Sequence, residues 1–207
     1  MTFQSLLAFA SIVFLIAVIP GPNALLVLYT ALAKNRLMAF ANVAGVAFGF
    51  IVHAFISALG LSLLIAQSTI AFIALKWVGV IYLFWLGWTN LKAGLSPKSL
   101  HVPKNNQVNS LTNNFVKGLL TNLLNPKIVL FYLSIFPQFV SREAVLTESV
   151  LLGVTQAVVV STWFFVVILL ARSFKQFLTN TNSARGLNIL SGSIFVAFGT
   201  KLATAEI

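Results

Sequence analysis

The stretch "VIPGPNALLV", residues 18–27, places two prolines, a glycine and an asparagine inside an apolar segment. The whole segment, Ser5–Leu28, is long enough to cross a bilayer as a helix. Pro20 has no N–H, so the carbonyl of Ile16 loses its helical partner. Pro22 has the same effect on the carbonyl four residues before it. The segment is therefore expected to be a membrane span whose helix is interrupted near its middle.

The interruption leaves free carbonyls before it and free N–H groups after it, and Gly21 lets the backbone bend. Such backbone is tolerated within a membrane only against protein or water. Carbonyls suit an ammonium group, and a helix N-terminus suits a carboxylate. The break and Asn23 behind it thus predict a site for an amino-acid zwitterion. A simple packing kink is the alternative, because transmembrane helices tolerate prolines.

Composition favours an all-α integral membrane protein, because 59% of the 207 residues are hydrophobic and only 8% are charged. The apolar residues come in long blocks, which predict transmembrane helices rather than amphipathic elements. The absence of cysteine excludes disulfides and thiolate metal sites, and we expect no metal and no cofactor. Six spans are predicted in one transmembrane domain: Ser5–Leu28, Ala39–Ala66, Ile70–Leu91, Phe115–Val140, Glu148–Leu170 and Leu187–Ala203.

Basic residues set the predicted orientation. Arg142 and Lys201 are the basic residues on one side of the membrane, whereas the connections after spans one, three and five carry nine of the chain's 13. Basic loops stay in the cytoplasm, so both termini are expected in the periplasm, across a bacterial inner membrane. The net charge of +10 is explained by this bias, and nucleic acid is not an expected partner. The nine are Lys34, Arg36, Lys92, Lys98, Lys104, Lys117, Arg172, Lys175 and Arg185.

One long polar connection, residues 93–114, is predicted to be a cytoplasmic loop between a first half, 1–92, and a second half, 115–207. Three spans on each side of it would make the halves inverted repeats, a recurring transporter architecture. The second half opens with its own proline-interrupted span, "LLNPKIVLFY", residues 123–132. We therefore expect proline-broken first and fourth helices. Glycine-rich helix faces also permit a homodimer.

Two basic side chains inside spans are candidate functional groups. Lys127 lies roughly 18 Å into the span that starts at Phe115, counting about 1.5 Å per residue. A charge at that depth indicates function by default, although a lysine can also extend toward the interface. His53 is the one side chain in a span that ordinarily titrates near neutral pH, which suits a proton carrier. Its alternative is a neutral histidine hydrogen-bonded between helices. Asn23, Asn122, Asn125 and Gln156 add polar groups that could line a cavity.

The chain resembles the LysE/RhtB family of amino-acid exporters. The resemblance runs through "PGPNALLVL", "GVAFGFIVHAFISALGL", "LKWVGVIYLFWLGW", "FVKGLLTNLLNPKIVLFYLSIFPQFV" and "LNILSGSIFVAFGTKL", and so covers nearly the whole chain in order. It implies a six-span bacterial inner-membrane protein that exports amino acids, using the proton motive force. Carried over residue by residue, it implies two site motifs, one of Pro20, Gly21, Pro22 and Asn23 and one of Asn125, Pro126 and Lys127.

Members of the family that the chain resembles differ in substrate: some export lysine and arginine, and others export homoserine, threonine or leucine. Relatives carry Asn or an acidic residue after the second proline of the first motif, and here it is Asn23. A cationic side chain gains no counter-charge there, which favours neutral amino acids. Protons, an amino acid and the lipid bilayer are therefore the expected partners.

Two other function classes compete with a proton-coupled exporter. A passive channel would need a continuous polar pathway, whereas the polar residues here cluster at mid-depth. An exporter of another small metabolite is the remaining transport alternative. An intramembrane enzyme would need paired carboxylates, Ser with His, or metal-binding His and Glu, and the spans hold one histidine and no acid at depth. We therefore expect no enzymatic activity.

Overall fold

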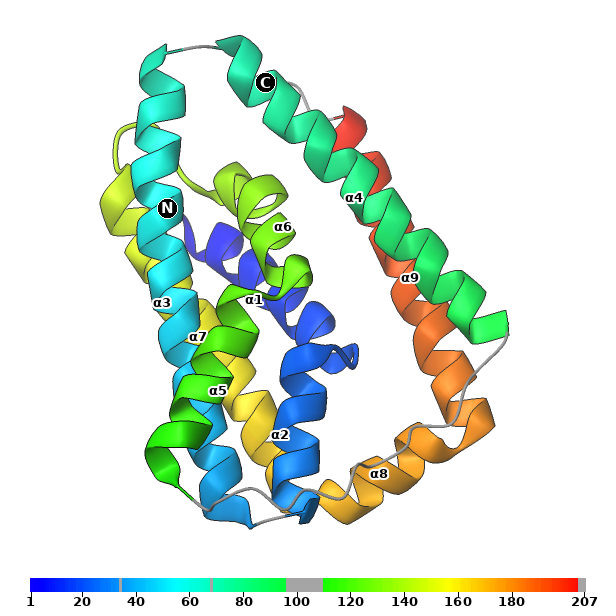
Figure 1. Ribbon diagram of the computed structural model, residues 1–207. Coiled ribbons are helices and arrows are strands. Elements are labelled where there is room, and N and C mark those ends of the chain that lie inside the picture. The colour runs from blue at the N-terminus through cyan, green and yellow to red at the C-terminus, as the bar shows by residue number, and fades with distance from the viewer. Residues whose placement is uncertain (34, 68, 96–109, 205–207) are drawn as a thin grey trace.

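The computed structural model describes residues 1–33, 35–67, 69–95 and 110–204, and all regular structure in these ranges is helical (Figure 1). The expected all-α class is confirmed. The elements are α1 (Phe3–Val18), α2 (Pro22–Ala33), α3 (Arg36–Gln67), α4 (Thr69–Leu95), α5 (Leu111–Leu123), α6 (Pro126–Ser134), a short 3₁₀ helix η1 (Phe136–Phe139), α7 (Val145–Leu169), α8 (Ala171–Thr179) and α9 (Thr181–Thr204).

The first predicted span is broken as expected. Helix α1 ends at Val18, Ile19 is extended with φ −69° and ψ 119°, and α2 begins at Pro22. The two helices meet at an angle of 57°. The break is thus an unwound turn and not only a kink. The fourth predicted span is divided in the same way, since α5 ends at Leu123 and α6 begins at Pro126.

Two helices in the described residues are long and apolar enough to cross a membrane unaided, over Arg36–Gly60 of α3 and Val145–Leu169 of α7. The bent pair α1–α2 makes a third if it is counted as one span. The six-span count and the inverted repeat therefore remain predictions.

The helices form a bundle with a separate pair beside it. Helix α3 packs along both α5 and α7, and α1 lies against α7. Helix α4 runs beside α9 and touches the bundle mainly through α6 (Figure 1). The start of α3 and helix α8 lie at the lower end in Figure 1, whereas the end of α9 lies toward the upper end. Which end of the bundle is cytoplasmic remains a prediction.

Glycines allow the closest helix crossings. A Cβ on Gly45 of α3 would collide with the carbonyl oxygen of Phe115 in α5, and one on Gly118 would collide with the carbonyl oxygen of Asn42. Between α4 and α9, a Cβ on Gly192 would lie 2.8 Å from the carbonyl oxygen of Gly87. Small residues let backbones approach where no hydrophobic effect drives helices together, and this accounts for the glycine spacing.

A cluster of aromatic rings fixes α6 and η1 against α1. The ring of Phe9, which is fully buried, has its centroid 5.8 Å from that of Phe131 and 5.9 Å from that of Phe136. Phe139 adds an edge contact at 5.3 Å. Tilted and edge-on geometries at these distances are favourable for aromatic pairs. The cluster thus packs the second half of α6 and η1 against the first half of α1.

Two parts of the chain differ from the sequence-based expectations. Helix α8, with Arg172 and Lys175 exposed, lies between the fifth and sixth predicted spans and was not expected. Helix α4 continues to Leu95 and α5 begins at Leu111, so helix covers both ends of the predicted loop 93–114. The rest of that loop, residues 96–109, lies outside the described residues.

Replacing Gly45 by alanine should lower the unfolding free energy of the purified protein by about 1–3 kcal/mol, because the added methyl group meets backbone atoms that cannot move aside. The matched control is Gly60→Ala in the same helix, where a Cβ meets no heavy atom within 4 Å. Thermal unfolding in detergent, followed by size-exclusion chromatography, measures both. Equal melting temperatures for the two variants would contradict the close α3–α5 crossing.

Candidate functional site

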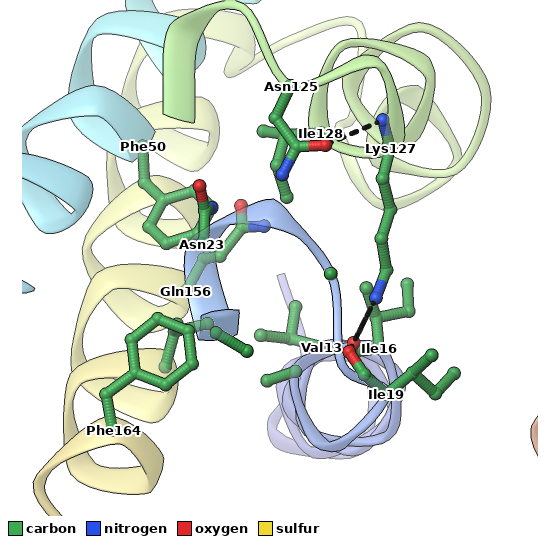
Figure 2. A pocket seen from close by; sticks show the side chains of 14 residues that line it. Val13, Ile16, Ile19, Asn23, Phe50, Asn125, Lys127, Ile128, Gln156 and Phe164 are labelled. Atoms are coloured by element: carbon green, nitrogen blue, oxygen red, sulfur yellow. Dashed lines mark hydrogen bonds between the residues drawn. The ribbon is translucent and has the colours of Figure 1, made fainter. Parts of the chain in front are cut away.

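The two broken spans meet at a pocket in the bundle (Figure 2). Its walls come from α1, the unwound turn, the start of α2, the start of α6, and the facing sides of α3 and α7. Four of the seven predicted binding residues line it: Gly21, Asn23, Asn125 and Lys127. The apolar walls include Val13, Ile16, Phe50, Ile128, Val160 and Phe164.

Lys127 bridges the two breaks. Its Nζ donates hydrogen bonds to the carbonyl oxygen of Ile16 at 2.6 Å and to that of Ile19 at 3.1 Å (Figure 2). The Ile16 carbonyl is the one that Pro20 leaves without a helical partner. The ammonium therefore satisfies backbone oxygens of a helix more than a hundred residues away in the chain. This geometry favours the interior placement of Lys127 over extension to the membrane surface.

Asn125 and Pro126 start helix α6 at the pocket. The Asn125 side chain is the N-cap, accepting a hydrogen bond from the backbone N–H of Lys127 at 3.1 Å through its Oδ1. Pro126 occupies the first helical position, where its missing N–H costs nothing. These two residues fix the point at which Lys127 leaves the backbone. Pro20, Pro22 and Pro126 shape the two breaks without lining the pocket.

Two buried amide oxygens in the pocket have no hydrogen-bond donor. Asn23 on α2 is 5% exposed and Gln156 on α7 is 2% exposed, and neither side-chain oxygen has a partner. Figure 2 shows both side chains reaching into the space between α2 and α7. An unsatisfied buried polar atom costs about 1–3 kcal/mol, so these two oxygens are candidate ligand contacts.

His53 does not line this pocket. It is buried on α3, where its ring stacks on Tyr132 of α6 with centroids 5.0 Å apart. Its Nε2 lies 3.5 Å from the carbonyl oxygen of Asn122, at the end of α5. Tyr132 in turn donates to the carbonyl of Phe50 at 2.8 Å. The histidine thus contacts the end of α5 at the second break and is not one of the residues that line the pocket.

The pocket is positively charged and small. Lys127 is the one ionisable side chain among the residues that line it. Glu148 of α7 is buried but pairs with the N-terminal amine at 2.7 Å and accepts from the Ser141 N–H, more than two turns before Gln156. The cavity volume is about 30 Å³, which is room for about two or three water molecules. An amino acid therefore enters only if side chains or helices move.

Sequence reasoning found the polar rim of the pocket and missed its far wall. Gln156 was one of several polar candidates within spans, with nothing to connect it to the breaks. Phe50 and Phe164 are ordinary apolar residues within long apolar blocks. No local signal marks them, because facing the pocket depends on how α3 and α7 pack around it.

Most of the chain matches a known protein family. The family model of the LysE type translocators matches residues 14–206. The chain belongs to the LysE family. The match begins within α1 and covers every residue that lines the pocket except Val13. No solved structure matches this LysE chain.

Named relatives of this LysE chain are efflux proteins. It is 32% identical to a homoserine/homoserine lactone efflux protein of Salmonella typhi, over 100% of this chain and 99% of the relative. It is 31% identical to a threonine efflux protein of Escherichia coli, over 88% and 89% of the two chains. A leucine efflux protein of Klebsiella pneumoniae is 33% identical over 92% and 91%.

Replacing Gln156 by leucine separates ligand binding from structure. We expect the melting temperature to stay the same or rise, because the change removes a buried oxygen that has no donor. Amino-acid efflux should fall at the same time. The control is Thr162→Val, also on α7, whose exposed hydroxyl only donates to the carbonyl of Val158. A Gln156→Leu variant with normal efflux would remove Gln156 from the site.

Proposed function

We propose that this LysE chain exports neutral amino acids from the cytoplasm in exchange for protons, through the pocket between the two broken spans. The observation that carries the proposal is the ammonium of Lys127 held on the carbonyls of Ile16 and Ile19. The ammonium group of an amino acid would need the same kind of partner, a pair of carbonyl oxygens. The unpaired oxygens of Asn23 and Gln156 beside it support a polar ligand.

The carboxylate of the amino acid would bind at the start of α2. Pro22 has no N–H and the N–H of Leu25 donates to the Gly21 carbonyl at 2.9 Å, which leaves the N–H groups of Asn23 and Ala24 for a ligand. A helix N-terminus attracts anions, so these two N–H groups form the proposed carboxylate position. The two charged ends of a zwitterion would thus lie on opposite sides of the unwound turn.

The substrate class follows from the walls. The residues that line the pocket include no Asp or Glu, so a cationic side chain would lie beside Lys127 without a counter-charge. Apolar walls such as Val13, Phe50 and Phe164 suit an uncharged side chain. Homoserine, threonine and leucine, named for the relatives, are all neutral amino acids.

Transport in this proposal proceeds by alternating access. The cavity of about 30 Å³ is too small for an amino acid, so the substrate must be admitted by movement of the broken helices. The basic end of the bundle faces the cytoplasm and both termini face the periplasm of a bacterial inner membrane. The two halves would act as inverted repeats around the pocket. A homodimer is compatible with the proposal and not required by it.

The first experiment is efflux from cells preloaded with labelled homoserine, threonine and leucine, with and without expression of the chain. We expect one or more of them to leave faster on expression, and a protonophore to abolish the gain. Saturable counterflow in proteoliposomes then separates a transporter from a channel, because a channel shows none. Unchanged efflux of all three and of a wider amino-acid mixture would refute the proposed cargo.

His53 is the proposed proton carrier. An imidazole ordinarily titrates near pH 6.5, between the pH values of the two compartments in acidic media. The His53 ring contacts the stacked ring of Tyr132 and the carbonyl oxygen of Asn122. Export should therefore rise as the external pH falls from about 8 to 6, and His53→Asn should flatten that rise.

The pH profile of efflux in proteoliposomes tests this role, with Tyr132→Phe as the comparison because it keeps the stacked ring. A His53→Asn profile that parallels the wild type would assign His53 to a structural role at the second break.

A further inference from the structure

The carbonyl pair proposed to bind the substrate is already occupied. Ile16 and Ile19 direct their oxygens at a single point, and the Nζ of Lys127 lies there with two short contacts. An ammonium group and the α-ammonium of an amino acid have the same charge, the same three donors and nearly the same size. A second cation cannot share the position with the first.

We propose that Lys127 is a tethered competitor for the ammonium group of the transported amino acid. When the substrate's ammonium takes the carbonyls of Ile16 and Ile19, the displaced Lys127 ammonium pairs with the substrate's carboxylate. This inference rests on the proposed function and makes it specific: the pocket selects ligands that carry both charged ends.

Space in the pocket supports displacement rather than simple addition. The lysine chain lies along the unwound turn, where a Cβ on Gly21 would be 3.7 Å from its Cδ and 3.8 Å from its Nζ. The remaining free volume is about 30 Å³. The room that a substrate ammonium and its α-carbon need at the carbonyls is therefore the room that the end of the lysine holds.

Charge supports the second half of the exchange. After displacement, the lysine ammonium remains inside the bundle and needs an anion or strong acceptors. The described lining holds no carboxylate, and Glu148 is engaged at the far end of α7. The carboxylate of an amino acid supplies the missing anion. An amine without a carboxylate would leave the lysine charge without a partner, which is costly.

The polar atoms opposite Lys127 fit the same arrangement. In Figure 2, Asn23 and Gln156 lie across the unwound turn from the lysine ammonium. Their unpaired oxygens can accept a hydrogen bond from a hydroxyl of the substrate's side chain. They do not neutralise a charge, so they cannot replace the carboxylate in releasing Lys127.

The test compares each amino acid with the amine that lacks its carboxylate: leucine with isoamylamine, threonine with isopropanolamine, and homoserine with propanolamine. Ligand-dependent thermal shifts of the purified protein measure binding without needing transport. The variants are Lys127→Met, which keeps the chain and removes the charge, and Lys92→Met as the control, an exposed lysine in the last turn of α4. Wild type and Lys92→Met should bind the amino acid and reject the amine.

In Lys127→Met, amine binding relative to amino-acid binding should improve by roughly thirty-fold or more, since a displaced charge no longer has to be paired. An unchanged ratio in a folded Lys127→Met protein would overturn the proposal. If that variant does not fold, the wild type decides: acetate should strengthen binding of the amine, because it supplies the anion for the displaced lysine. Independent binding of amine and acetate would overturn the proposal.

Different results would refute the proposed function and the competitor role of Lys127. A wild-type protein that binds none of the three amino acids refutes the proposed function, and the competitor role with it. A wild type that binds an amino acid, rejects its amine no better than Lys127→Met does, and shows no effect of acetate refutes the competitor role alone.

Discussion

The contact of the Lys127 ammonium with the carbonyls of Ile16 and Ile19 is the interaction on which the rest of the site depends. Within a bilayer, a backbone carbonyl without a donor costs several kcal/mol, and a buried ammonium without acceptors costs about 2.5–3.5 kcal/mol or more. The hydrogen bonds between them lower the free-energy cost of burying both the ammonium and the carbonyls. The unwound turn is therefore tolerated only while the start of α6 stays against the end of α1, and the ring cluster around Phe9 adds a second contact between α1 and the α6–η1 segment.

The carbonyl freed at the second break, between α5 and α6, also has a basic side chain near it. Pro126 leaves the carbonyl of Asn122 without its helical partner, and that oxygen accepts from the Asn125 N–H at 3.1 Å and lies 3.5 Å from Nε2 of His53. A basic side chain from the other predicted half thus contacts the freed carbonyl at each break. The contact of Lys127 is short and that of His53 is long, so the two differ in strength. Movement at one break cannot occur without changing a contact to the other half of the chain.

Sequence alone predicted the breaks because their cause is local. Proline removes an N–H wherever it stands, so the freed carbonyl of Ile16 followed from counting four residues back from Pro20. The partner of that carbonyl was not predictable, since Lys127 lies 111 residues away and both interior and interfacial placements were consistent with its position. The same limit applies to His53. Its depth follows from its place in a span, whereas its contacts with Tyr132 and Asn122 depend on how α3 packs against α5 and α6.

The unwound turn also accounts for why a site of this kind can be made with few polar residues. An intact helix would need charged side chains to hold a zwitterion, and each would cost several kcal/mol to insert. The break supplies an acceptor pair and a donor pair from the backbone at no cost in charge. One lysine then suffices, because its ammonium is held by the carbonyls while the pocket is empty of substrate and can be held by a carboxylate when it is full. A site that keeps its single charge paired in both conditions keeps the free energies of the empty and occupied states close, which suits a transporter that must both bind and release its substrate.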